Sequence, residues 1–311
     1  MKPGKLVISS GVFLAVTLPY WVVIPAAGYL LEVILAVILI WGAVENHLKV
    51  LIGACAIGLI VGALPGPAVL PFVLFFPLWL KAILPAIMLG LLIIRGWRAG
   101  NSFVLVAVAI AGFVMITYGQ GVELFDQQID LMGESIKSMI TGTLTSQGYS
   151  SEVIVDTADK LAYMAGLLKR LLPGLLIMSG IGQLFVSFVA VEWYFTRRDS
   201  YFPGFGPFIY WKIPEKLLYF LGLVLIARLI NDGVVKMAAD NILFILSFFY
   251  AVCGLSLIEH LLRRLQLPMF MKIIFYFGLF LMQLPGLVAA SIIGLFDSYF
   301  DFRKVKAHTL G

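Results

Sequence analysis

The sequence predicts an all-α fold, a polytopic bundle of transmembrane helices with eight or nine spans and a short amphipathic helical insertion. The first reason is composition, since 61% of the 311 residues are hydrophobic and only 13% are charged. A water-soluble domain of this composition could not cover its surface with polar groups. The second reason is that apolar segments recur along the whole chain, near the roughly 20 residues that a helix needs to cross about 30 Å of hydrocarbon.

Nine apolar segments are candidate spans. The first imitates a secretory signal, but it lacks a good cleavage site and another apolar segment follows at once, so we expect it to be retained. Pro65-Gly66-Pro67 separates the third segment from the fourth and predicts a hairpin there. The candidates are residues 6–24, 28–44, 50–64, 71–94, 102–119, 171–194, 217–235, 241–260 and 269–295.

Basic residues beside these segments predict the orientation, because cytoplasmic loops of membrane proteins are enriched in Lys and Arg. A cytoplasmic N-terminus places the basic loops at 47–49, 95–98, 197–216 and 263–264 on the cytoplasmic side. Nine crossings would, however, place the basic tail at 303–306 outside. One candidate is therefore not a full crossing: either 71–94, which has Lys81 at its centre and could form a re-entrant pair, or 269–295, which Pro285-Gly286 interrupts.

Residues 120–170 are more polar than the rest of the chain and carry seven acidic side chains. Apolar residues recur there at helical spacing, over 129–144 and again over 154–168. We expect two amphipathic helices, joined at Gly148-Tyr149, that lie on the outer face and cover one side of the bundle, or that gate the entry of a solute. The predicted organisation is one integrated membrane domain, with spans in 1–119, the insertion at 120–170, and spans with a basic tail in 171–311.

No motif for catalysis or cofactor binding is visible. The net charge of +5 is explained by the basic loops, so no nucleic-acid partner is expected. A nucleotide-binding GxxxxGK[ST] loop is missing, so the chain alone cannot power transport with ATP. The histidines His47, His260 and His308 are unrelated in position, and Cys55 and Cys253 lie far apart in apolar runs. We therefore expect no enzyme activity, no cofactor and no metal site.

Charged residues inside predicted spans are better candidates for function, because a charge in hydrocarbon is costly and usually faces the bundle interior. Glu32 lies four residues into its span, and Arg228 and Asp232 are four residues apart, where they could pair with each other. Asn241 begins another span. These four residues are our candidates for a ligand site or polar cavity. The other charged residues within spans are Lys81, Glu192 and Lys272.

Small residues recur at every fourth position, which lets helices approach closely. One such series is Ala54, Gly58, Gly62 and Gly66, and Ala290 with Gly294 forms a shorter one. Contacts of this kind pack helices within one chain, or they bind a separate subunit.

The last third of the chain carries a recognisable set of residues. Trp211-Lys212-Ile213-Pro214 opens a span, and the chain closes with Gly294, Asp297, Asp301 and Arg303 in a Gly-x-x-Asp-x-x-x-Asp-Phe-Arg pattern. This set resembles the YybS-like family of uncharacterised multi-pass bacterial membrane proteins. The resemblance implies a place in the bacterial inner membrane. It also implies a distant similarity to the substrate-binding subunits of energy-coupling-factor importers, which work with a separate ATPase and a coupling protein.

The closing pattern also has a physical interpretation. Asp297 and Asp301 share one face of a helix, and Arg303 follows just beyond it. Such a cluster could clamp the helix end to a neighbouring loop through charge-assisted hydrogen bonds, or it could contact a partner.

Three functions remain open from the sequence. The leading hypothesis is a non-enzymatic subunit that binds or transports a small solute together with partner proteins. The second is an envelope scaffold or assembly factor that binds other membrane proteins. The third, an enzyme that acts on lipid, would require Glu32, Glu192 and Asp232 to share one cavity.

Overall fold

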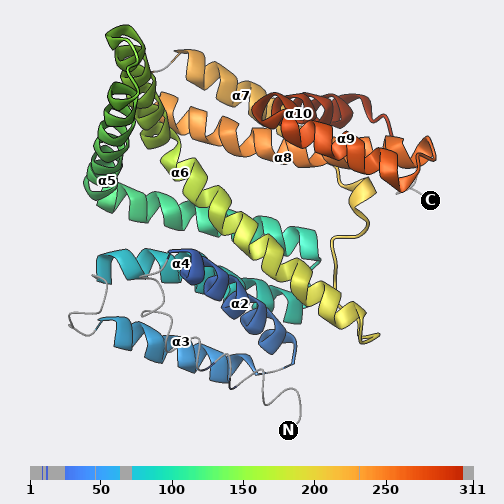
Figure 1. The fold of residues 1–311 in the computed structure, drawn as a ribbon. Helices are drawn as coiled ribbons and strands as arrows, with labels where there is room; N and C mark the ends of the chain where they lie inside the picture. Colours follow the sequence, from blue (N-terminus) through green and yellow to red (C-terminus); the bar gives the residue numbers. More distant parts are fainter. Residues whose placement is uncertain are drawn as a thin grey trace. The chain divides into compact units, whose positions relative to one another are not determined.

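A computed structural model describes residues 9, 12, 25–45, 47–63, 72–230 and 232–303. The predicted first span, 6–24, lies outside these residues except for two positions. Within the described ranges the chain forms α-helices and one short 3₁₀ helix and contains no strand, which confirms the predicted all-α class (Figure 1). The helices are α2 (Pro25–Val44), α3 (Leu48–Ala63), α4 (Phe72–Ile94), α5 (Ala99–Ser146), α6 (Ser151–Thr196), η1 (Phe208–Tyr210), α7 (Lys216–Ile230), α8 (Val234–Arg264), α9 (Met269–Leu281) and α10 (Gln283–Phe300).

The chain divides into two compact units. Unit 1 comprises Met1–Ile140 and Leu175–Gly204, and unit 2 comprises Thr141–Gly174 and Phe205–Gly311. Helices α5 and α6 contribute residues to both units. The single integrated membrane domain expected from the sequence stays a prediction.

In unit 1, α2 packs against α4, and α3 packs against both. The re-entrant pair considered for residues 71–94 is wrong, because α4 is one continuous helix from Phe72 to Ile94. Its two prolines, Pro77 and Pro85, do not divide it. Proline is tolerated in membrane helices when neighbouring groups satisfy the carbonyls that it frees.

The acidic segment at 120–170 is helical and turns at the predicted position. Gly148 adopts a positive φ of 77°, and the Tyr149 N–H donates to the carbonyl of Leu144, which closes the end of α5. The two helices expected there are present, but these two arms are not separate from the neighbouring spans: α5 runs from Ala99 to Ser146, and α6 runs from Ser151 to Thr196 with Pro173 inside it. Large apolar side chains of the arms are exposed, among them Met139, Tyr163 and Met164.

Length and apolar composition identify three helical segments among the described residues that can cross a membrane: Ala99–Gly119, Ser151–Thr196 and Val234–Arg264. A fourth is added if α9 and α10 together make one span. Shorter apolar helical segments are Leu30–Val44 and Ile83–Ile94. The chain is therefore a membrane protein with several apolar helices, and the count of eight or nine spans stays a prediction.

In unit 2, α8 packs against α7 on one side and against α10 on another. The contact between α8 and α10 brings two backbones together. A Cβ atom on Gly254 would lie 1.9 Å from the carbonyl oxygen of Ala290, and one on Gly294 would lie 2.0 Å from that of Tyr250. The predicted small pair, Ala290 and Gly294, therefore packs helices within the chain.

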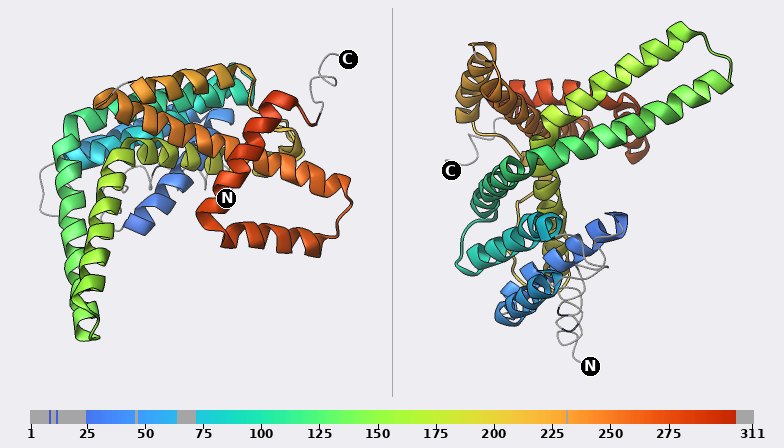
Figure 2. Two further views of the ribbon diagram at one scale, coloured as in Figure 1. Left: turned by 90° about the horizontal axis from the view of Figure 1, so that it is seen from above. Right: turned by 90° about the vertical axis from the view of Figure 1, so that its left-hand side faces the viewer.

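Helices α9 and α10 meet at a sharp break. Their axes are bent by 112°, and the left panel of Figure 2 shows the chain turning back between them. The interruption was predicted at Pro285-Gly286, whereas the helix stops at Met282, three residues earlier. Pro285 falls in the first turn of α10, where the missing N–H group removes no helical hydrogen bond.

Candidate functional site

Unit 1 carries polar side chains in its interior, where α2 meets α6. Glu32 on α2 is 4% exposed and Gln183 on α6 is 1% exposed. The hydroxyl of Ser187, one turn beyond Gln183, lies 3.3 Å from the carbonyl oxygen of Val33 and 2.9 Å from that of Gln183. Ser187 therefore joins α6 to α2 at the residue that follows Glu32.

The Gln183 amide is buried without a hydrogen-bond partner among the described residues, at both its oxygen and its nitrogen. The indole N–H of Trp41 on α2 is also buried without a hydrogen-bond partner among the described residues. An amide can make about four hydrogen bonds, and leaving a buried polar group unpaired costs roughly 1–3 kcal/mol. Gln183 and Trp41 are thus buried polar groups whose hydrogen-bonding capacity is unused among the described residues.

Of these residues, the sequence identified only Glu32, whose burial the structure confirms. Gln183 is uncharged, so the rule that marks charged residues inside spans does not identify it. Its signal in the sequence is an amide and a hydroxyl, Gln183 and Ser187, in an otherwise apolar stretch of α6.

Asn241, the second predicted site residue, bridges a break in α6. Pro173 lies inside that helix, and in a regular helix the N–H of Gly174 would donate to the carbonyl of Arg170. Here the Gly174 N–H donates to Asn241 Oδ1 over 2.6 Å, and Asn241 Nδ2 donates to the Arg170 carbonyl over 2.8 Å. Asn241 thus satisfies both groups that the proline separates.

The neighbouring residue, Asp240, joins three helices. Its Oδ1 accepts from Arg228 Nε of α7 over 2.6 Å, and its Oδ2 forms an ion pair with the guanidinium of Arg170 of α6. The expected pairing of Arg228 with Asp232 does not form, because α7 ends at Ile230 and Asp232 lies beyond it. The Asp232 side chain is 93% exposed and pairs with Lys236, so it lines no buried cavity.

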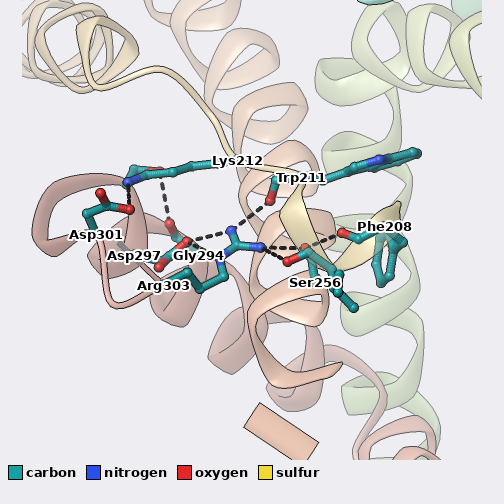
Figure 3. A network of polar contacts seen from close by, with 10 residues as sticks. Phe208, Trp211, Lys212, Ser256, Gly294, Asp297, Asp301 and Arg303 are labelled. Carbon is teal, nitrogen blue, oxygen red and sulfur yellow. Dashed lines mark hydrogen bonds and ion pairs between the residues drawn. The ribbon is translucent and has the colours of Figure 1, made fainter. Parts of the chain in front are cut away.

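At the C-terminal end of unit 2, Arg303 and Asp297 form an ion pair whose side chains are 0% and 1% exposed. Asp297 Oδ2 accepts from Arg303 Nη2 over 2.6 Å and from Nε over 3.1 Å. The guanidinium also donates to Ser256 Oγ over 2.7 Å and to the carbonyl oxygens of Ile209 and Trp211, over 2.6 and 2.7 Å (Figure 3). We call this set of contacts the Arg303 clamp.

Asp301 provides the backbone turn that brings Arg303 to the clamp. This residue adopts a left-handed conformation, with φ of 50°, at the end of α10, and the chain then turns so that Arg303 faces Asp297. Its carboxylate pairs with Lys212 Nζ at 2.6 Å. The predicted clamp between the helix end and a neighbouring loop is therefore present. Trp211 takes part through its carbonyl. Gly294 lies outside the clamp, where its backbone packs against that of Tyr250 and Gly254 on α8, and Pro214 is exposed.

Glu259, near the end of α8, is the centre of a third cluster of polar contacts. Its Oε1 accepts from Arg263 Nε over 2.6 Å and from Lys272 Nζ over 3.4 Å, and its Oε2 accepts from the Tyr276 hydroxyl over 3.0 Å. Lys272, expected as a charge within a span, is thus paired with a carboxylate of the preceding helix. Within the described ranges, no three His, Cys, Asp or Glu side chains lie close enough to hold a metal ion.

Comparison with known proteins identifies the family but supplies no closer relative. Neither the search of curated proteins nor that of solved structures found a match to this chain. A family model described as "Predicted membrane protein (DUF2232)" matches residues 12–298, which is most of the chain. The apolar helices described above agree with that description. The chain therefore belongs to this family of predicted membrane proteins.

Proposed function

We propose that this protein is a non-enzymatic membrane subunit that binds a small solute in unit 1 and delivers it together with partner proteins. The observation that carries the proposal is the Gln183 amide, buried between apolar helices with neither end hydrogen-bonded among the described residues. A polar group in such a place is costly unless something pairs with it. The solute is the molecule that supplies this pairing.

The chemistry of the site suggests the class of solute. Gln183 offers an acceptor oxygen beside two donor hydrogens. A small molecule with neighbouring donor and acceptor groups, such as an amide or a lactam ring, would match the Gln183 amide.

Transport would require a partner. The sequence has no nucleotide-binding loop, so energy would come from a separate ATPase and a coupling protein, as the resemblance to importer subunits implies. We place the protein in the bacterial inner membrane with a cytoplasmic N-terminus.

Thermal unfolding in detergent tests the proposal. Purified protein is screened against vitamins and other small polar solutes, with Gln183→Leu as the test variant and Gln127→Leu, at an exposed position of α5, as the control. We expect a solute that raises the Tm of the wild type and of the control, but not that of Gln183→Leu. Without solute, Gln183→Leu should be at least as stable as the wild type, because leucine removes an unpaired polar group at similar volume. A panel that stabilises nothing, or that stabilises Gln183→Leu equally, contradicts the proposal.

A second candidate function is an envelope scaffold or assembly factor. The observation that favours it is the exposed apolar surface on the arm of α6, where Tyr163 is 74% and Met164 is 64% exposed. Flexible methionines are common on surfaces that bind other proteins.

Co-purification from membranes separates the two functions. Recovery of an ATPase pair supports the importer subunit, and recovery of division or wall-synthesis proteins supports the scaffold. If the arm of α6 binds scaffold partners, the double variant Tyr163→Glu with Met164→Glu should release them. It should leave solute binding at Gln183 unchanged.

A further inference from the structure

Charged residues of unit 2 gather at two levels along α8. Asp240 and Glu259 are 259 − 240 = 19 residues apart, and no charged residue stands between them. At 1.5 Å per residue this separation is about 28 Å, close to the roughly 30 Å of a bilayer's hydrocarbon core. An α8 that crosses the membrane would place the two carboxylates near the boundaries between hydrocarbon and headgroups, at opposite faces.

At the Asp240 level, positive charge exceeds negative charge. Arg170 of α6 and Arg228 of α7 share the single carboxylate of Asp240, which leaves a net charge of +1. Their side chains are 38% and 42% exposed. A guanidinium has five N–H donors, and one from each arginine reaches Asp240, so several donors are directed away from the carboxylate.

An exposed apolar surface adjoins these arginines. Leu225, Ile226, Leu229 and Ile230 on α7, within one turn of Arg228, are 44%, 56%, 78% and 76% exposed. Apolar side chains at this depth face lipid tails, whereas guanidinium groups suit phosphate oxygens, which they bind in a bidentate manner. Headgroup and tail contacts thus lie next to each other on one surface.

From this geometry we infer that Arg170 and Arg228 bind the phosphate group of an anionic phospholipid whose acyl chains lie along α7. The arginines hold the phosphate between α6 and α7, while Asp240 fixes their orientation from α8. This site is in unit 2 and does not depend on the solute site proposed for unit 1.

Binding is measured on the full-length protein in detergent, by native mass spectrometry and by Tm. The probes are phosphatidylglycerol, phosphatidylcholine and inorganic phosphate at equal concentrations. We expect phosphatidylglycerol to remain bound and to raise the Tm, with phosphatidylcholine weaker by about tenfold. Equal stabilisation by inorganic phosphate would assign the site to a free anion and overturn the lipid, and equal binding of phosphatidylcholine would overturn the preference for an anionic headgroup.

Variants locate the site. Arg228→Gln should weaken phosphatidylglycerol binding by about tenfold, whereas Arg264→Gln, which removes one charge at the exposed end of α8, should leave it unchanged. If Arg228→Gln does not fold, Arg228→Lys keeps the charge but loses the planar fork, and it should still bind several-fold more weakly. Equal affinity in the folded Arg228 variants and in Arg264→Gln overturns the inference.

Discussion

Arg303 is a fully buried cation that holds three separate parts of unit 2 together. It contacts α10 through Asp297, α8 through Ser256, and the loop before α7 through two backbone carbonyls. A buried ion pair stabilises little compared with an apolar pair, but removal of one partner leaves the other charge buried and uncompensated. We therefore expect any substitution of Arg303 to lower the stability of unit 2.

Arg303→Ala should lower the free energy of unfolding by about 3–5 kcal/mol. Arg303→Lys should recover only a part, because one ammonium group cannot reach acceptors arranged around a planar fork. Thermal or denaturant unfolding in detergent measures both, with Arg264→Ala, at an exposed position, as the control within about 0.5 kcal/mol of wild type. If Arg303→Ala unfolds like Arg264→Ala, the clamp is not a stabilising contact.

We expect Asn241 to stabilise the protein mainly because Pro173 interrupts the hydrogen bonds within α6. Asn241→Ala leaves the N–H of Gly174 and the carbonyl of Arg170 without their partner, and the unpaired Gly174 N–H, which is buried, costs about 1–3 kcal/mol. In a Pro173→Ala background those two groups can bond to each other, so the same substitution should cost less. A double-mutant cycle of unfolding free energies measures the difference, and a coupling energy near zero would mean that Asn241 does not act through the proline.

The sequence was informative about which residues matter and uninformative about their partners. Arg303, Asp297 and Asn241 were all identified in advance, the first two with the correct helix-end clamp. Arg228, by contrast, was assigned to Asp232 because they are four residues apart, whereas the structure pairs it with Asp240 of the next helix. Spacing within a helix can be read from a sequence, but contacts between helices depend on packing.

Among the helices, α8 and α10 make the closest approach described, at Gly254 and Gly294. The methyl group of Gly254→Ala would overlap a backbone carbonyl of α10, and backbone cannot move aside as a flexible side chain can. We expect this overpacking to lower the free energy of unfolding by about 1–3 kcal/mol. Gly278→Ala on α9, where a Cβ meets nothing within 4 Å, is the matched control. Equal Tm values for the two variants would contradict the close packing.

The start of α9 and the end of α10 both lie beside the C-terminal part of α8. Glu259 contacts Lys272 and Tyr276 of α9, while Ser256, one turn away, contacts Arg303, just after α10. From these contacts and the 112° bend between the two helices, we predict a re-entrant pair rather than a crossing. Such a topology would keep Arg263, Arg264 and Arg303 on one side of the membrane, as expected for basic residues near a cytoplasmic surface.

Cysteine labelling in intact cells tests this topology. Leu265→Cys and Phe302→Cys, at exposed positions after α8 and after α10, are made in a chain whose Cys55 and Cys253 are replaced by alanine. We expect both to be protected from a membrane-impermeant maleimide and to react only once the membrane is permeabilised. Labelling of only one of them in intact cells would mean that the pair crosses the membrane.

For the molecule as a whole, composition was sufficient to predict residence in lipid and an all-α fold, because the hydrophobic effect acts on total apolar area. It was not sufficient to say where one helix stops. Residues 120–170 were assigned to separate helices since their polarity changes at 120, yet polarity reports the solvent around a helix and not its end. Likewise, the uncharged Gln183 escaped a search based on charge, and only its burial revealed it.

The Asn241 bridge has a consequence for how the chain is made. The amide that closes the Pro173 break belongs to a residue synthesised 241 − 174 = 67 positions after Gly174. Until α8 emerges from the ribosome, α6 must leave the translocation channel with an open turn, or wait beside it. We predict that α6 waits: a nascent chain stalled before residue 241 should show α6 still crosslinked to the channel, and a chain stalled after α8 should show it released into lipid. Release before residue 241 is made would mean that α6 enters lipid with the turn open.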